Sequence, residues 1–113
     1  MFMNNFKIEL LEYITEDGEN PFHKWLNSLK DSAMRARIRV RLNRLRLGNF
    51  GDCKSVGKGV SELRIDYGPG YRVYFGKSET TIVILLSGGS KKSQTKDIKL
   101  AQKYWADYKR RTK

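Results

Sequence analysis

Apolar and polar residues alternate near the start of the chain, in the segment from Asn5 to Thr15. Phe6, Ile8 and Leu10 would point to one side of an extended backbone, because side chains alternate between the two faces of a strand. This segment is therefore predicted to form a β-strand with one buried face.

Two helices are predicted next. Asn20 can cap the first, and Pro21 fits its first turn, where a backbone N–H has no helical partner. The second is predicted over residues 31–48, although its alternating arginines also suit a strand. Asp31 can cap its start and Gly48 can end it. Its apolar residues form one helical stripe, which consists of Met34, Ile38, Leu42 and Leu45.

Three strands are predicted in the second half, over Ser61 to Asp66, Tyr71 to Phe75 and Thr81 to Ser87. Short turns between them favour an antiparallel meander. The last strand is apolar on both faces, so we expect it to be a central strand rather than an edge strand. The glycine-rich residues 48–59 lack the sequence of a phosphate-binding loop and are interpreted as turns.

A final helix is predicted after Gly89, with Ser93 as its cap. Its apolar stripe consists of Ile98, Ala101, Trp105 and Tyr108. Together these elements predict a single α+β domain over residues 1–113. We expect a small, mainly antiparallel twisted sheet of about four strands, two helices from the N-terminal half packed on one face, and a C-terminal helix.

The charge is positive and unevenly distributed. The 113 residues include 23 Lys and Arg against 12 Asp and Glu, a formal net charge of +11. Residues 1–30 contain three lysines and five acidic residues, so the whole surplus lies after residue 30. Such a surplus favours nucleic acid as partner or substrate, because neutralised phosphates release counterions. Solubility alone is the alternative explanation.

Cysteine content and hydropathy bear on location. Cys53 is the only cysteine, which excludes a disulfide within the chain and a cysteine-based zinc site. No motif predicts a metal or another cofactor. The apolar run from Thr81 to Leu86 is far shorter than the roughly 20 residues of a membrane-spanning helix, and the N-terminus lacks the apolar core of a signal peptide. We therefore expect a cytoplasmic protein with no membrane partner.

Arginines flank the apolar stripe of the second helix on both sides. Arg37, Arg41 and Arg44 share one flank and are candidates for RNA contact. The alternative is a solvated face whose arginine stems cover apolar surface. Val40 and Leu47 point away from the stripe, which suggests a second contact surface.

Basic and aromatic side chains are predicted to share the polar face of the sheet. Strand alternation places Arg64, Arg72 and Tyr74 on that face. If the helices cover only the apolar face, these side chains converge on an open surface, with Lys91 and Lys92 at its end. Such a platform suits phosphate capture and base stacking.

RNA cleavage on this platform would need no nucleophile from the protein, because the ribose 2′-OH can attack the adjacent phosphate. Arginine and lysine stabilise the charge that develops on the phosphoryl oxygens. No Ser-His-Asp or Cys-His arrangement is evident, and His23 is interpreted as a surface or packing residue. Proton transfer stays unassigned, because lysine and arginine are weak bases at neutral pH.

Several motifs closely resemble the addiction-module killer proteins of the RelE toxin superfamily, in their HigB-like branch. They are Glu62-Leu63-Arg64-Ile65, the run from Gly68 to Phe75, the run from Leu85 to Gly89, and Lys91-Lys92-Ser93-Gln94. Shorter matches at Trp25-Leu26 and Gly48 to Asp52 extend the resemblance over nearly the whole chain. It implies a compact toxin that cleaves messenger RNA, usually on the ribosome, and an antitoxin encoded by the adjacent gene.

The resemblance also implies roles for individual residues. Arg72 matches the phosphate-stabilising arginine of the family, Arg64 a basic position on the neighbouring strand, and Lys92 the basic residue after the last strand. Glu62 departs from the best-known RelE pattern, which has a lysine there. The catalytic tyrosine of that pattern falls near Ile98, so it does not transfer.

Tyr74 is therefore considered as the substitute for that tyrosine. Lys91, Lys54 and Lys58 join the helix arginines as candidate RNA contacts. The leading hypothesis is a ribosome-dependent mRNA endoribonuclease of a type II toxin–antitoxin system.

Partners and alternatives follow from the same resemblance. Val40 and Leu47 are candidate antitoxin contacts, because an acidic antitoxin would complement the arginine-rich helix that carries them. A non-catalytic RNA- or ribosome-binding module is one alternative. A co-repressor that binds operator DNA together with the antitoxin is another.

Overall fold

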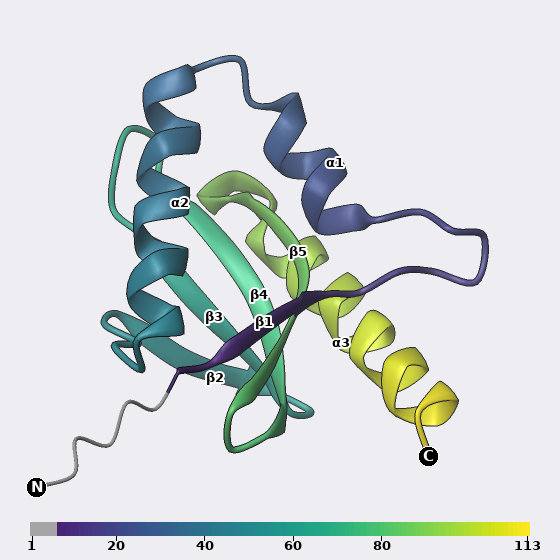
Figure 1. Cartoon of the computed structure of the whole chain (residues 1–113). Coiled ribbons are helices and arrows are strands. Elements are labelled where there is room, and N and C mark those ends of the chain that lie inside the picture. The colour runs from purple at the N-terminus through teal and green to yellow at the C-terminus, as the bar shows by residue number, and fades with distance from the viewer. Residues whose placement is uncertain (1–6) are drawn as a thin grey trace, which may run out of the picture.

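Five strands form one mixed sheet in the order β1-β5-β4-β3-β2 (Figure 1). This computed structural model describes residues 7–113. The strands are β1 (Glu9–Glu12), β2 (Cys53–Gly57), β3 (Val60–Ile65), β4 (Tyr71–Glu79) and β5 (Ile82–Ser90). β2 to β5 are antiparallel neighbours, and β1 pairs with β5 in parallel. The α+β class, the mainly antiparallel sheet and the interior position of β5 are confirmed, and the sheet has five strands where about four were predicted.

Two helices pack on one face of the sheet. They are α1 (Pro21–Ser28) and α2 (Ser32–Arg46), and their predicted caps are confirmed. The Asn20 side chain accepts a hydrogen bond from the backbone N–H of His23 at 3.0 Å, and Asp31 accepts one from Ala33 at 2.9 Å. The core on this face includes the α2 stripe Met34, Ile38, Leu42 and Leu45, together with Leu63, Val73, Phe75 and Leu85.

The C-terminal helix α3 (Gln94–Arg111) covers the opposite face of the sheet, after a short 3₁₀ turn, η1 (Lys91–Ser93). Its residues Ala101 and Trp105 pack against Val60, Tyr74 and Ile84 in a second core. The expectation of an open sheet face is therefore wrong. These strand residues are apolar, so covering them with the apolar side of α3 gains hydrophobic free energy.

Several element boundaries differ from the sequence predictions. β2 lies within residues that were interpreted as turns, because it is a short, mostly exposed edge strand without an alternating pattern. β1 starts at Glu9, and the predicted strand residues Asn5 and Phe6 lie outside the described part of the chain. β4 continues to Glu79, beyond the predicted end at Phe75.

Glycines in the sheet allow tryptophans of the covering helices to approach the backbone. A Cβ at Gly88 in β5 would lie 2.2 Å from the Trp25 ring of α1, and a Cβ at Gly76 in β4 would lie 2.6 Å from the Trp105 ring of α3. Both distances are shorter than any normal contact. Glycine at these positions lets both helices pack tightly on the sheet.

Gly76→Ala is expected to lower the free energy of unfolding by about 1–3 kcal/mol, because the added methyl group overpacks a buried site. The Trp105 side chain that the methyl group would meet is almost fully buried. Urea unfolding followed by tryptophan fluorescence measures the change. Ser78→Ala, at an exposed position of the same strand, is the control and should change stability little.

Candidate functional site

A buried carboxylate, that of Glu62, lies at the centre of a polar cluster on the α3 side of the sheet. The register of β3 and β4 places Arg64 opposite Arg72 and Glu62 opposite Tyr74. The Nε atoms of Arg64 and Arg72 lie 3.4 Å and 3.5 Å from Glu62 Oε1 and Oε2, respectively. The Glu62 side chain is 0% exposed. Its charge is therefore compensated within the protein, by the two guanidinium groups.

Two neutral side chains complete this cluster. The Tyr74 hydroxyl donates a hydrogen bond to Glu62 Oε2 at 3.2 Å, and the Gln94 amide donates one to the same oxygen at 2.8 Å. Burial, and then the nearby charge of Glu62, raise the pKa of the Tyr74 hydroxyl. The phenol therefore stays protonated at neutral pH and remains a donor.

The placement of Tyr74 corrects one sequence prediction. Tyr74 was expected on an open face of the sheet, as the substitute for a catalytic tyrosine. Its side chain is instead fully buried beneath α3, where Ala101 and Trp105 belong to the same core. Tyr74 does not line the cleft described next, and it holds the Glu62 carboxylate instead.

A cleft of about 320 Å³ opens beside this cluster, at the C-terminal end of β3. Arg64, Arg72 and Lys91 line it from three separate strand ends, together with Asp52 and Asp66. The Arg64 side chain is 39% exposed and that of Arg72 is 10% exposed, so Arg64 is the more accessible of the two. Three fixed cations on one small cleft can bind and stabilise a phosphate group.

The backbone fixes Lys91 at the cleft, because its N–H donates a hydrogen bond to the Gly70 carbonyl at 3.0 Å, in the turn between β3 and β4. Lys92 is exposed and lines a separate cavity with residues of the first turns of α3, among them Lys96 and Lys99. Lys92 therefore does not line the cleft that holds the two arginines, and its role in catalysis stays a prediction. The backbone turns at η1, so consecutive side chains point to different sides.

Two carboxylates that the sequence patterns do not indicate, those of Asp52 and Asp66, also line the cleft. Asp52 directly precedes β2 and Asp66 directly follows β3. Because β2 and β3 are antiparallel, the start of one lies beside the end of the other, and the Arg64 N–H donates to the Asp52 carbonyl at 2.9 Å. Placing Asp52 at the cleft from the sequence would have required a prediction of strand β2.

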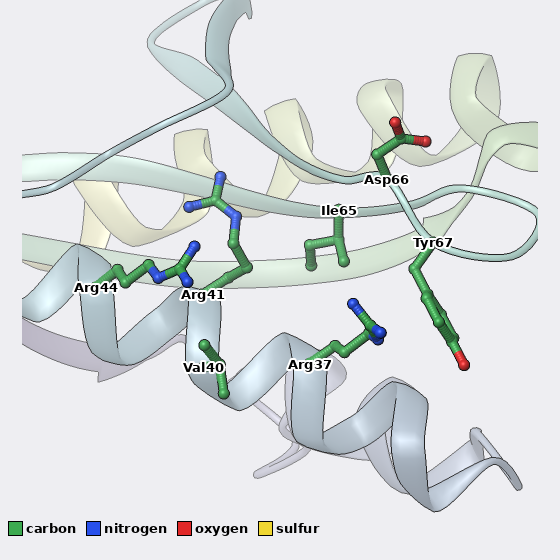
Figure 2. Close-up of a pocket in the computed structure, with 7 residues that line it drawn as sticks. All are labelled: Arg37, Val40, Arg41, Arg44, Ile65, Asp66 and Tyr67. Atoms are coloured by element: carbon green, nitrogen blue, oxygen red, sulfur yellow. The ribbon is translucent and has the colours of Figure 1, made fainter.

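The arginines of α2 form a second basic surface next to the cleft (Figure 2). Arg37, Arg41 and Arg44 line one cavity, as their shared helix flank predicts. The Arg37 guanidinium lies 4.0 Å from the centre of the Tyr67 ring. Arg41 donates hydrogen bonds to the carbonyls of Phe50 and Arg64 at 3.3 Å and 3.4 Å, which ties α2 to β3.

The remaining candidates lie away from the cleft. Lys54 is exposed on the edge strand β2, and Lys58 lies in the turn before the opposite end of β3. Val40 and Leu47 are 48% and 71% exposed, which agrees with their predicted outward direction. Val40 also lines the cavity of the α2 arginines.

Other site chemistry is not evident within residues 7–113. No group of three or more His, Cys, Asp or Glu side chains in this range could hold a metal ion. His23 is exposed on α1 and lines a groove with Arg39 and Arg46, away from the cleft. None of the described helices has the length and hydropathy needed to cross a membrane.

Two comparisons with known proteins cover this region. The sequence pattern of the family described as "Phage derived protein Gp49-like (DUF891)" matches residues 24–106. That range includes α2, the whole cleft and the Glu62 cluster. An uncharacterized protein of Haemophilus influenzae is 53% identical over 81 residues, which is 72% of this chain and 82% of that protein.

Proposed function

We propose that this chain is the toxin of a type II toxin–antitoxin system. The chain belongs to the phage-derived Gp49-like family (DUF891), which is toxin-like and related to addiction modules. Its activity would be that of a HigB-like endoribonuclease of the RelE superfamily, acting on messenger RNA at the ribosome in the cytoplasm. The cationic cleft is the observation that carries this proposal.

The proposed reaction is attack of a ribose 2′-OH on the adjacent phosphate. It forms a 2′,3′-cyclic phosphate and breaks the bond from phosphorus to the 5′-oxygen, which leaves and takes up a proton to become a 5′-hydroxyl. Arg72 and Arg64 bind the phosphoryl oxygens and stabilise the charge that develops on them, and Lys91 assists from the end of β5. The pairing of both arginines with Glu62 supports this role, because it fixes the guanidinium groups before the substrate arrives.

In this proposal, the carboxylates of the cleft carry out the proton transfer. Asp52 and Asp66 can accept the proton of the attacking hydroxyl, and both are exposed and line the same cavity as the arginines. The buried Tyr74 and the distant His23 lack this access.

The α2 surface serves RNA and antitoxin in this proposal. Arg37, Arg41 and Arg44 extend the positive surface beyond the cleft, where the strand can continue. Val40 and Leu47 are exposed apolar side chains among these cations, which suits an acidic antitoxin segment with apolar anchors. The antitoxin would be the product of the adjacent reading frame.

Induced expression tests the function. We expect growth arrest and new 5′ ends within translated messages, mapped by primer extension, and both effects should disappear when the adjacent reading frame is co-expressed. Strong, salt-sensitive RNA binding without new 5′ ends would contradict the enzymatic claim and favour a non-catalytic RNA-binding module.

A further inference from the structure

A second cavity, of about 280 Å³, lies between α2 and the end of β3 (Figure 2). Ile65 and Asp66 line both this cavity and the catalytic cleft, so the two are contiguous. A linear polymer bound in the cleft could therefore place its next monomer in the second cavity.

The walls of this cavity are positively charged. Arg37, Arg41 and Arg44 reach it from successive turns of α2, and Asp66 is its only acidic lining residue. Among the ion pairs of residues 7–113, none joins these three guanidinium groups to a carboxylate. Arg41 donates only to backbone carbonyls. Such cations attract an anionic ligand.

The cavity also offers flat and apolar surface. In Figure 2 the Arg37 guanidinium points toward the Tyr67 ring, and its central carbon lies 4.0 Å from the ring centre. The buried side chain of Ile65 and the half-exposed Val40 supply apolar contacts beside this pair. A planar, anionic ligand fits these features better than a compact anion, because the planar guanidinium group and the phenol ring both stack on flat π systems.

We propose that this cavity is a nucleotide subsite, which binds the base of the nucleotide next to the scissile phosphate of single-stranded RNA. The base stacks on the Arg37–Tyr67 pair, and Arg41 and Arg44 bind the phosphate of that nucleotide. The assignment rests on the proposed function of the adjacent cleft. Continuity with that cleft favours RNA over an acidic antitoxin segment, which is the competing occupant.

Binding to short 2′-O-methyl RNA, which cannot undergo 2′-OH attack, tests the subsite apart from cleavage. The dissociation constant is measured by fluorescence anisotropy for the intact oligomer and for oligomers with one abasic position. We expect Tyr67→Leu to raise the dissociation constant for intact RNA roughly 5- to 100-fold, the usual cost of losing one stacked base. For the parent chain, one abasic position should raise the dissociation constant more than any other. With Tyr67→Leu, an abasic site at that position should no longer raise it.

Matched variants separate stacking from general charge. Tyr67→Phe keeps the ring and should bind RNA almost as the parent does. Arg37→Gln and Arg39→Gln remove the same charge from opposite flanks of α2, and Arg39 lines a different groove. The subsite predicts a larger loss of affinity for Arg37→Gln, whereas equal losses would overturn it.

The antitoxin serves as the competing ligand in the same assay. If Tyr67→Leu weakens antitoxin binding and leaves RNA binding and the abasic penalty unchanged, the occupant is the antitoxin and the subsite proposal is wrong. This result would leave the cleavage function intact. Conversely, a parent chain that cleaves no message refutes the proposed function without any change in these binding constants.

Discussion

Arg72→Ala is expected to lower the rate of RNA cleavage about 100- to 1000-fold, which is the usual effect of removing one preorganised donor from a developing anion. The Arg72 side chain is only 10% exposed and pairs with the buried Glu62, so its guanidinium is held in one position at the cleft. Solvent or a neighbouring lysine cannot replace a donor that is fixed in this way. Single-turnover cleavage of a message in a reconstituted translation system measures the rate.

Two further variants make this result specific. Arg72→Lys keeps the charge but loses the planar fork of donors, and should recover only part of the rate. Lys103→Ala removes an exposed cation of α3, outside the cleft, and should cleave at nearly the parent rate. Equal losses for Arg72→Ala and Lys103→Ala would mean that total charge matters and the cleft does not.

Glu62→Ala is expected to lower the free energy of unfolding by about 3–5 kcal/mol, because it leaves paired buried groups without their partner. Arg72, Tyr74 and Gln94 all direct polar atoms at this carboxylate, and the first two are almost fully buried. Urea unfolding gives the change in stability, and Glu79→Gln, at an exposed acid of β4, is the control. A loss no larger than that of the control would refute the role of Glu62 as the centre of the cluster.

Glu62→Gln distinguishes positioning from stability alone. The amide has nearly the same shape but no charge, so the fold should tolerate it better than alanine, while Arg64 and Arg72 lose the anion that orients them. We expect the maximal cleavage rate to fall more than the apparent affinity for the message. Full activity in a destabilised Glu62→Gln protein would assign Glu62 a purely structural role.

The sequence was sufficient to predict the helices and one core. Capping residues Asn20 and Asp31 and the α2 stripe are local signals, and each is confirmed. The cross-strand pair Arg64 and Arg72 was also predictable, because alternation along two neighbouring strands fixes which side chains share a face. Local periodicity therefore predicted correctly that Arg64 and Arg72 share a face, but not that α3 covers this face and leaves Arg72 nearly buried.

The position of α3 was missed although one signal for it was present. β5 is apolar on both faces, as expected of a strand that is covered on both sides. That pattern predicts an interior position for β5 and also a covering layer on each face, whereas the hydroxyl of Tyr74 suggests a polar face. The hydrophobic ring of Tyr74 dominates its placement, and Glu62 satisfies its hydroxyl.

The acidic side of the cleft depends on a long-range contact. Asp52 and Asp66 meet only because β2 pairs with β3, and the mostly polar, exposed β2 has no alternating pattern that predicts a strand. Likewise, the separation of Lys91 from Lys92 depends on the tight turn of η1. Such features follow from the assembled sheet and its connections, which periodicity does not specify.

The chemistry of the cleaved ends tests the central claim most directly, namely that the cleft promotes attack of the 2′-OH on the adjacent phosphate. This reaction leaves a 5′-hydroxyl on the downstream fragment, so that fragment should become ligatable to an adaptor only after treatment with a kinase. We expect this kinase dependence at every site cut by the parent chain, and no cuts above background with Arg72→Ala. Fragments that carry a 5′-phosphate without kinase treatment, or undiminished cuts with Arg72→Ala, would contradict the account.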